Sequence, residues 1–557
     1  MTHVATGTST DGPSQPPAGP AKPVASTCMR LALLLAVALL LLVGPALPTV
    51  AADYPARDAG YHSYPEMVRH IKAVAATHPG IVRLFSIGQS HQGRKLWAAE
   101  VTDNPGIDEG EPEILFDGLH HAREHLSAEM PLYVLDLLTR QYGKSSQLGK
   151  RVTRLVDQRR TWIVFMVNPD GLQHDLGGTP YRSWRRNRQP TPGSNRIGTD
   201  LNRNYGYRFG CCGGSSGKPG AWNYRGPSAW SAPETRAMRD FIVSRRADGR
   251  QRIRTHITFH TAGELVLWPY GYTRRDTPPD MTELDWRTFR AMGRAMAATN
   301  GYRAQQSSQL YPTDGDMIDW AYARERIFSF TFELYPRAGS SPAKYYPPDE
   351  VIGRETRRNR DAVLYLMSRA VCPYGALGKT AVRLNCGPFF DDLEIARGWR
   401  VDPDGSDTAS DGRWQRGDPQ RGDLQLGSAA SGRSVLVTGR APGHDVDGGR
   451  TSVRSPLVTL PPAGATLRLR YWVGLSRGAS ESDGLRVHVV DRDGGRLATV
   501  LDVSGTGAKR KPAWRSLVAP LPADLGGRRV AIELEAIDAG EGALVEAAVD
   551  QVRITRD

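Results

Sequence analysis

The pattern of apolar residues changes once along the 557-residue chain, after Cys386. Before it, stretches with helical spacing such as YPEMVRHIKAVAATHP alternate with short β-rich runs such as RTWIVFMVNPDG and RIRTHITFHT. After it, helical spacing disappears, and short alternating strands such as LRVHVVDRDGG follow one another with Gly/Asp turns between them. The first pattern predicts an α/β domain and the second an all-β sandwich, with a boundary at residues 372–387.

The amino-acid composition is that of a globular protein and says little about partners. Hydrophobic residues make up 39% of the chain and charged residues 24%. The formal net charge of +13 could attract an anionic polymer, but no run of Lys and Arg is dense enough for a nucleic-acid patch. We therefore interpret the surplus as a basic, soluble surface and expect no nucleic-acid partner.

The N-terminal 52 residues are predicted to lie outside the folded part. The first 28 residues are rich in Gly, Pro, Ser and Thr, and we interpret them as a disordered extension from an upstream start site. Residues 29–52 begin with Met, continue with Arg30 and the apolar run 31–44, and end on small residues, the pattern of a secretory signal peptide. We expect cleavage near Ala52, secretion, and no stable membrane anchor, because the apolar run is too short for a comfortable span.

Export would place the four cysteines that follow the predicted signal peptide in an oxidising compartment. These are Cys211, Cys212, Cys372 and Cys386. Cys372 and Cys386 flank a short Gly-containing loop and can pair, which would leave a vicinal disulfide between the other two. Cross-pairing is equally allowed, since four cysteines permit three connectivities.

The segment GLHHAREHLS, residues 118–127, places His and Glu at a spacing suited to one metal ion. His121 and Glu124 are i and i+3, so both face the same side of a helical turn. His125 offers an i+4 alternative to Glu124, whereas His120 points elsewhere in either regular conformation. Two nitrogens, one carboxylate oxygen and an open position make a catalytic zinc site, so a second histidine should come from a distant segment.

Further motifs follow HAREH in a fixed order. They are NPDG, RSWRRNR, DLNRNY, YRGPSAWSAPE, FHTAGELVLWPYGY, LYPTDGDMIDWAY and FTFELYP. Together they resemble the zinc carboxypeptidases of the M14 (carboxypeptidase A) family over residues of about 60–370. The resemblance implies an α/β/α catalytic domain at residues 53–371, with a mixed, mostly parallel central sheet flanked by helices.

The resemblance also implies the zinc ligands and the catalytic residues. His121, Glu124 and His260 would hold one zinc ion and leave one position for water. Glu333 would be the general base that takes a proton from the zinc-bound water and later delivers it to the leaving amine. Arg185 would stabilise the oxyanion of the tetrahedral intermediate.

The same resemblance predicts how a free C-terminus would be recognised. Asn202 and Arg203 would bind the terminal carboxylate, because a planar guanidinium suits a bidentate carboxylate. Tyr311 would close over that carboxylate, and Arg123 would contact the substrate one residue upstream. Asp200 is expected to be a structural partner nearby. The resemblance therefore predicts peptides and proteins with a free C-terminus as substrates.

Three residues are candidates for setting the side-chain preference. Ile318 matches the family position at the base of the pocket, where an apolar residue suits aromatic and aliphatic C-termini. Asp316 lies two residues earlier and Asp314 four residues earlier in the same loop, where an acid could receive a basic side chain. We therefore predict a preference for large apolar C-terminal residues with secondary activity on Lys and Arg.

Residues 388–557 resemble, less specifically, the jelly-roll modules appended to secreted bacterial hydrolases. Asp445, Asp447 and Asp550 are candidate ligands of a structural Ca²⁺, although Asp/Gly turns are the commoner explanation of such residues. The module would bind carbohydrate or a cell surface, or would only stabilise the enzyme.

The leading interpretation is a secreted, monomeric, zinc-dependent metallocarboxypeptidase. One alternative is a peptidoglycan-trimming peptidase on the same scaffold, and the presence of the Asn202–Arg203 clamp argues against it. The other alternative is a surface-binding protein with an inert peptidase domain. The intact set of zinc-ligand and catalytic residues argues against that interpretation.

Overall fold

The computed structural model describes residues 52–247, 250–337, 342–540 and 542–556. The predicted extension (1–28) and all but the last residue of the predicted signal peptide (29–52) lie outside the described residues. Across the described ranges, none of the helices combines the length and apolar character that a bilayer crossing requires.

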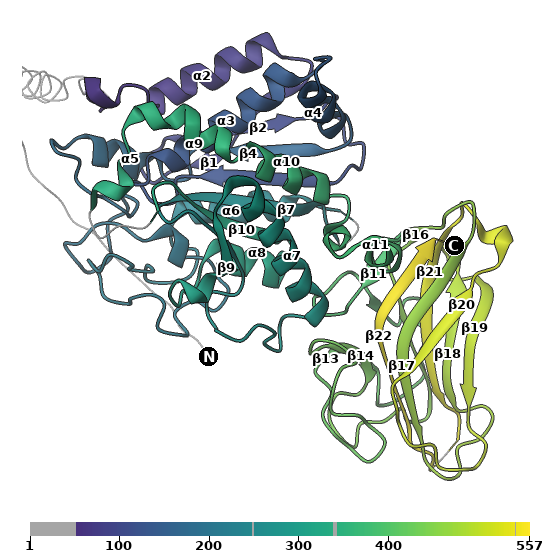
Figure 1. Cartoon of the computed structure of the whole chain (residues 1–557). Helices are drawn as coiled ribbons and strands as arrows, with labels where there is room; N and C mark the ends of the chain where they lie inside the picture. Colours follow the sequence, from purple (N-terminus) through teal and green to yellow (C-terminus); the bar gives the residue numbers. More distant parts are fainter. Residues whose placement is uncertain (1–51, 248–249, 338–341, 541, 557) are drawn as a thin grey trace, which may run out of the picture. The chain divides into compact units, whose positions relative to one another are not determined.

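An eight-stranded sheet forms the centre of the N-terminal part of the molecule (Figure 1). In spatial order its strands are β1 (Val82–Gln89), β2 (Lys95–Val101), β4 (Arg160–Val164), β3 (Glu113–Gly118), β7 (Ile253–Thr261), β10 (Phe328–Leu334), β8 (Leu265–Trp268) and β9 (Arg303–Gln306). The pairs β4–β3, β3–β7, β7–β10 and β8–β9 are parallel, and the other three are antiparallel. The predicted mixed, mostly parallel sheet is confirmed.

The central strands are buried on both faces because helices cover them. Of these helices, α3 packs on β3 and β7, α6 on β1, α7 on β8 and β9, and α8 on β10. Figure 1 shows α2, α3 and α4 on one side of the sheet and α6 and α8 on the other. The longer helices are α2 (Tyr64–Thr77), α3 (Leu126–Gln141), α4 (Gln147–Asp157), α5 (Pro169–Leu176), α6 (Pro233–Ser244), α7 (Glu283–Asn300), α8 (Met317–Glu325) and α10 (Arg360–Arg369); α9 (Ile352–Arg358) and α11 (Lys379–Asn385) are shorter.

Local sequence explains several helix ends. A capping box between Ser63 and Glu66 starts α2, and Gly301 ends α7 in the left-handed conformation (φ 71°). The helices α9 and α10 follow each other directly and are divided at Asn359. The Asn359 amide nitrogen donates to the Glu355 carbonyl, and its amide oxygen accepts a bond from Asn300. These side-chain bonds compete with the regular helical pattern.

The carboxyl ends of β3, β7 and β10 lie side by side in the sheet. In register, Gly118 at the end of β3 pairs with Phe259, and His260 of β7 pairs with Glu333 of β10. A Cβ at Gly118 would come within 2.2 Å of the Ser127 carbonyl oxygen, so the turn after β3 requires glycine. Ligand sites in α/β sheets form at this edge.

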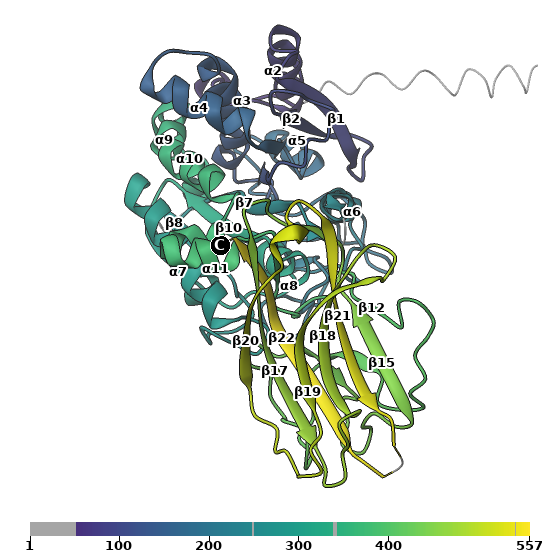
Figure 2. The ribbon, with the colours of Figure 1, turned by 90° about the vertical axis from the view of Figure 1, so that its right-hand side faces the viewer.

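The C-terminal part consists of two antiparallel sheets (Figure 2). One sheet holds β13 (Trp414–Gly417), β14 (Val435–Thr438), β22 (Val545–Arg556), β17 (Ala465–Leu475) and β20 (Arg515–Pro520), with β11 (Phe389–Asp391) on β22. The other holds β12 (Arg400–Val401), β15 (Gly449–Arg454), β21 (Arg529–Asp538), β18 (Gly484–Val490) and β19 (Arg496–Ser504), with β16 (Val458–Thr459) on β21. The predicted all-β architecture is confirmed.

Each part has its own hydrophobic core. The buried residues of the first cluster run from Tyr54 to Tyr374, and those of the second from Phe389 to Ile554. The four cysteines form the bonds Cys211–Cys212 and Cys372–Cys386, one of the connectivities that the sequence allowed.

The predicted calcium site in the C-terminal part is not supported. Asp445 lies close enough to Asp447 for their charges to interact, but Asp550 is elsewhere and accepts bonds from the Ser431 and Gln551 amides. In the described residues of this part, His, Cys, Asp and Glu form no group of three close enough to hold a metal. The three aspartates therefore do not act together.

Candidate active site

The predicted metal ligands converge at the carboxyl edge of the sheet. The chain leaves β3 through Leu119, which has a positive φ of 61°. Residues 120–125 then form a turn rather than the helical turn that the i, i+3 spacing suggested, and α3 begins only at Leu126. The Glu124 amide still donates to the His121 carbonyl at 3.1 Å, so this turn keeps both side chains on one side.

The three side chains surround one point. Glu124 Oε1 lies 2.7 Å from His121 Nδ1, and Glu124 Oε2 lies 2.9 Å from His260 Nδ1. The two Nδ1 atoms are 3.1 Å apart, and all three groups are buried. A cation fits between two ring nitrogens that face each other beside a carboxylate. Two imidazole nitrogens and one carboxylate oxygen are a ligand set typical of catalytic zinc sites.

The protonation of this cluster suits a metal site. Burial lowers the pKa of His260 to about 4, so its imidazole is neutral at pH 7. Burial alone would raise the pKa of Glu124, but the His121 and His260 imidazoles outweigh this effect and lower it well below the usual value. A neutral imidazole and an ionised carboxylate are the forms that bind metals.

Asp200 links the metal cluster to the predicted oxyanion arginine. Its Oδ1 accepts a bond from His121 Nε2 at 3.1 Å, and its Oδ2 accepts one from Arg185 Nε at 2.9 Å. The first contact fixes the His121 tautomer and leaves Nδ1 free to face the cluster. The second orients the guanidinium. Asp200 therefore has the structural role that was expected of it.

One buried nitrogen of the Arg185 guanidinium, Nη2, has no hydrogen-bond partner among the described residues. Arg185 Nη1 lies 3.6 Å from Glu124. Its guanidinium carbon lies 5.0 Å from the ring centroid of Trp222, a residue that is 54% exposed. Sequence reasoning missed Trp222, because a single aromatic residue in a Gly/Ser-rich loop carries no pattern.

Glu333 stands beside the metal cluster at the end of β10, in register with His260. Burial, with the nearby Glu124 charge, raises the pKa of Glu333 to about 8. Its side chain lines the same pocket as the metal ligands. A carboxyl group with this pKa is mostly protonated at pH 7 and close to half ionised at pH 8, so it can both release and accept a proton near neutral pH, as general acid–base catalysis requires.

The predicted carboxylate-binding residues line the same pocket as the metal cluster. Asn202 and Arg203 lie in a short 3-10 turn, Leu201–Arg203, that Asp200 caps. The Asn202 amide oxygen accepts a bond from the Met317 amide. Arg203 is 1% exposed, donates from Nε to the Gly214 carbonyl at 3.1 Å, and keeps Nη2 without a partner among the described residues.

The remainder of the pocket is shaped by loops and by the start of α8. Tyr311 is 39% exposed, and its ring centroid lies 5.9 Å from the guanidinium carbon of Arg203. Ile318 lies on the first turn of α8, and Asp316 is the N-cap of that helix. Other residues that line the pocket include Leu267, Ser307, Leu310, Thr313, Thr331, Lys344 and Tyr345.

Asp316 lines the pocket and is held by neighbouring groups. It is buried, its Oδ1 accepts a bond from the Asp319 amide at 2.9 Å, and its Oδ2 accepts one from the Thr313 hydroxyl. Burial raises the pKa of Asp316 above its usual value. Each oxygen already accepts one bond, so Asp316 is a weaker acceptor for a basic side chain than an exposed carboxylate would be.

Arg123 packs against a pocket residue that sequence reasoning missed. Its guanidinium carbon lies 4.0 Å from the ring centroid of Tyr345, and its Nη2 donates to the Tyr345 hydroxyl at 3.2 Å. Lys344 and Tyr345 belong to a short 3-10 segment whose sequence has no chemical signature. Arg123 therefore reaches the pocket rim through an aromatic neighbour.

The other histidines near the cluster have structural partners. His120 Nε2 bonds to the Tyr205 hydroxyl at 2.8 Å, outside the metal cluster, as the sequence predicted. His125 lies among aromatic rings and contacts Asp175 at 3.0 Å. The choice of His121 and His260, the two histidines of the cluster, thus agrees with the geometry.

Comparisons with known proteins give the family. The model of the zinc carboxypeptidase family matches residues 67–362, which is more than half of the chain. A zinc carboxypeptidase from Saccharothrix mutabilis subsp. capreolus is 44% identical over 328 residues, covering 59% of this chain and 74% of that protein. Carboxypeptidase A1 of Rattus norvegicus is 30% identical over 279 residues, covering 50% of this chain and 62% of the relative.

The fold agrees with the sequence matches. The crystal structure of thrombin activatable fibrinolysis inhibitor aligns with a TM-score of 0.50 and 25% identity, covering 56% of this chain and 74% of that one. The matched sequence includes the turn after β3, the ends of β7 and β10, and the loops between them. The chain therefore belongs to the zinc carboxypeptidase family.

Proposed function

We propose that this enzyme removes the C-terminal residue from peptides and proteins that have a free carboxylate, and that it prefers large apolar residues there. The observation that carries the proposal is a pair of buried guanidinium nitrogens, Nη2 of Arg185 and Nη2 of Arg203, without partners among the described residues. Both arginines line one pocket with the His121 cluster and Glu333. Unsatisfied buried donors of this kind favour an anion.

The site residues divide the work between a metal end and a carboxylate end. His121, Glu124 and His260 would hold zinc, which when bound lowers the pKa of water and polarises a carbonyl group. Glu333 would accept the proton of the attacking water at its carboxylate and pass it to the leaving amine. Arg185 would donate from Nη2 to the oxygen on which negative charge develops.

At the carboxylate end, Arg203 and Asn202 would bind the terminal carboxylate. Arg203 offers Nη2, and Asn202 keeps its amide nitrogen for the substrate because its oxygen already accepts the Met317 amide. Tyr311, exposed at the pocket, would donate its hydroxyl to the same group. Arg123 with Tyr345 would contact the residue upstream of the scissile bond.

The side-chain preference follows from the pocket lining. Leu267, Leu310 and Ile318 offer apolar surface, and Lys344 would repel a basic side chain. Asp316 favours Lys and Arg only weakly, because both of its oxygens already accept bonds. We therefore propose that activity on Lys and Arg is secondary to activity on aromatic and aliphatic residues.

A single assay tests the proposed reaction. Mature protein is given matched peptides ending in Phe, with a free or an amidated C-terminus, with and without a zinc chelator. Chelator-sensitive release of Phe from the free peptide alone supports the proposal. Cleavage of both peptides would indicate an endopeptidase instead. Equal kcat/KM for peptides ending in Asp and in Phe would overturn the proposed preference.

We also propose a domain organisation, a location and an oligomeric state. We propose a catalytic domain at residues 53–371, a linker at 372–387 and an accessory β-sandwich at 388–557, supported by the two separate hydrophobic cores. We further propose that the protein is secreted and acts as a monomer, the former on the signal-like sequence of residues 29–52. N-terminal sequencing of exported protein tests cleavage near Ala52, and a retained N-terminus would exclude it.

A further inference from the structure

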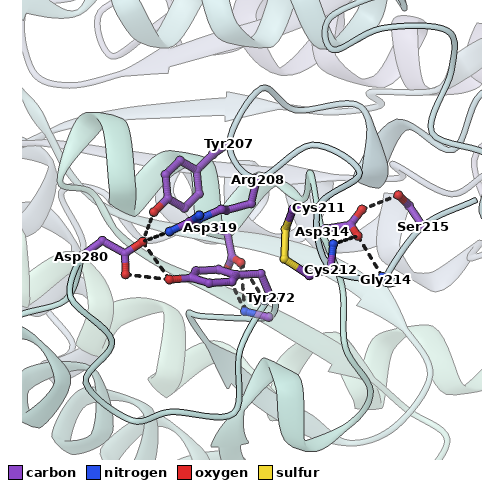
Figure 3. Close-up of a disulfide and its surroundings, with 11 residues drawn as sticks. Tyr207, Arg208, Cys211, Cys212, Gly214, Ser215, Tyr272, Asp280, Asp314 and Asp319 are labelled. Carbon is purple, nitrogen blue, oxygen red and sulfur yellow. Dashed lines mark hydrogen bonds and ion pairs between the residues drawn. A yellow bond between two sulfur atoms is a disulfide. The ribbon is translucent and has the colours of Figure 1, made fainter. Parts of the chain in front are cut away.

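A disulfide between adjacent residues lies beside the carboxylate end of the pocket. Cys211 and Cys212 are bonded to each other in the loop that follows the Leu201–Arg203 turn, and both are exposed (Figure 3). After Gly213, the residues Gly214 and Ser215 turn back toward Asp314. This disulfide turn, residues 211–215, has no part in the chemistry assigned above.

The disulfide turn binds Asp314 through three donors. The Cys212 amide donates to Asp314 Oδ2 at 3.2 Å, and the Gly214 amide donates to the same oxygen at 2.8 Å. The Ser215 hydroxyl donates to Asp314 Oδ1. Figure 3 shows these bonds on one side of the disulfide. A carboxylate held by two amides and a hydroxyl is a strong anchor for its loop.

The same turn also contacts the arginine of the carboxylate clamp. The Gly214 carbonyl accepts the bond from Arg203 Nε at 3.1 Å. A Cβ at Gly214 would lie 2.3 Å from the Thr313 carbonyl carbon, so the turn packs directly on the loop backbone. A displacement of the turn would break the Arg203 Nε bond, leaving the guanidinium held by its Nη1 bond to the Asn202 carbonyl, and would disturb the loop around Asp314.

That loop carries several residues of the pocket. Tyr311 precedes Asp314, and Asp316 follows it as the cap of α8. The Thr313 hydroxyl donates to Asp316, and the Gly315 carbonyl accepts the Tyr205 amide at 2.9 Å. One disulfide turn thus supports the two sides of the carboxylate-binding pocket, the guanidinium and the tyrosine loop.

The segment before the disulfide is fixed separately. Tyr207 and Arg208 both contact Asp280, which also accepts bonds from the Tyr272 hydroxyl (Figure 3). The disulfide lies between this contact and the bonds to Asp314. A bond between neighbours closes a very short loop, so it adds little to global stability but removes local backbone freedom.

We propose that the Cys211–Cys212 disulfide positions Arg203 and the Tyr311 loop for the substrate carboxylate, and that its reduction weakens substrate binding while leaving the metal end intact. The inference rests on the proposed carboxypeptidase function. The cysteines are positioning residues, since they act through Gly214 and Asp314. Their exposure makes the bond accessible to a small reductant in solution.

A water-soluble phosphine is the suitable reductant, because a dithiol would also bind zinc. The phosphorus lone pair attacks one sulfur and the S–S bond breaks, which leaves a thiolate on the other cysteine. Water then hydrolyses the phosphorus–sulfur bond. The products are two thiols and one phosphine oxide, so the disulfide gains two electrons and the phosphine loses two.

The test compares kcat and KM for a Phe-ended peptide with a free C-terminus. The Cys211→Ser/Cys212→Ser variant and phosphine-treated wild type are expected to show a KM raised about tenfold, with kcat within about twofold. Zinc content and Tm should stay close to those of the untreated protein. Phosphine should have no further effect on KM of the double variant.

The second disulfide provides a matched control. Cys372→Ser/Cys386→Ser removes a bond that closes a 14-residue separation, and it should leave KM unchanged whatever it does to Tm. An unchanged KM in both the Cys211/Cys212 variant and the reduced wild type would overturn the inference. So would a joint loss of kcat, zinc and Tm, which would indicate general unfolding. Wild-type protein that releases no residue from any free C-terminus would instead overturn the proposed function itself.

Discussion

The two ends of the active-site pocket are built in different ways. The metal end uses the turn after β3 and the last residues of β7 and β10, three neighbouring strands of the central sheet. The carboxylate end uses a 3-10 turn and the loop 311–316. Strand ends keep reacting groups within tight limits, whereas loops hold their shape only through specific polar bonds.

This difference predicts two kinds of functional loss. Changes at the metal end should remove catalysis while the fold and the carboxylate pocket remain. Changes at the carboxylate end should weaken binding, because the pairs Arg203–Gly214 and Asp314–Gly214 hold the loops without touching the metal cluster. Kinetic constants, zinc content and Tm measured together distinguish the two.

The largest effect is expected at the metal cluster. His121→Ala should abolish stoichiometric zinc binding and reduce peptidase activity below detection, because the site would lose one of its three ligands. His120→Gln is the matched control, since the neighbouring His120 bonds to the Tyr205 hydroxyl outside the cluster. Elemental analysis of both variants checks the prediction. Zinc lost from the His120 variant and kept by the His121 variant would reverse the ligand assignment.

A loss of about 10³-fold in kcat is expected for Glu333→Gln, with KM within about threefold. The amide has nearly the same shape but cannot accept a proton, so substrate and zinc should still bind. Steady-state kinetics with the Phe-ended peptide and a zinc assay measure both properties. A variant with unchanged kcat would show that the base is another group.

At the metal end, motif order carried the prediction and periodicity did not. The i, i+3 spacing paired His121 with Glu124, whereas His260 and Glu333 were chosen because their motifs resemble those of the zinc carboxypeptidases. An apolar pattern predicts strands, but a single His or Glu at a strand end does not reveal which side chains it will meet. The structure brings His121, Glu124 and His260 together, and residues 120–125 form a turn and not the helical turn that the spacing suggested.

The carboxylate end depends on contacts that have no periodic signal. Asp316 lines the pocket as expected of an acceptor there, but the bonds that its oxygens accept from Thr313 and Asp319 have no signal in the sequence. Trp222 and the disulfide turn lie in a Gly/Ser-rich loop without any periodic pattern. Likewise, the calcium prediction in the β-sandwich failed because Asp550 lies on β22 among other partners.

At the carboxylate end, Arg203→Ala is expected to raise KM for free-C-terminal peptides about 100-fold while kcat falls much less. The substrate carboxylate would lose a buried charge-assisted partner, whereas His121, Glu124 and Glu333 would stay in place. Arg203→Lys should give an intermediate KM, because lysine keeps the positive charge but lacks the paired N–H groups that bind a carboxylate in a bidentate manner. A kcat that falls as far as kcat/KM would place Arg203 in the chemical step instead.

The smallest effect concerns pH and basic substrates. Burial raises the pKa of Asp316, so its carboxyl is more often protonated at a given pH than an exposed aspartate. As pH rises through this raised pKa the group ionises, and an ionised Asp316 attracts a Lys side chain. The ratio of kcat/KM for a Lys-ended peptide to that for a Phe-ended peptide should therefore rise with pH. The rise should be only a fewfold, because the Asp319 amide and the Thr313 hydroxyl already donate to the Asp316 carboxylate and weaken its attraction for a Lys side chain. Asp316→Asn keeps an N-cap for α8 and should give a ratio that does not change with pH. A ratio that falls with pH in the wild type, or an unaltered rise in the variant, would exclude Asp316 as the source of any activity on basic C-termini.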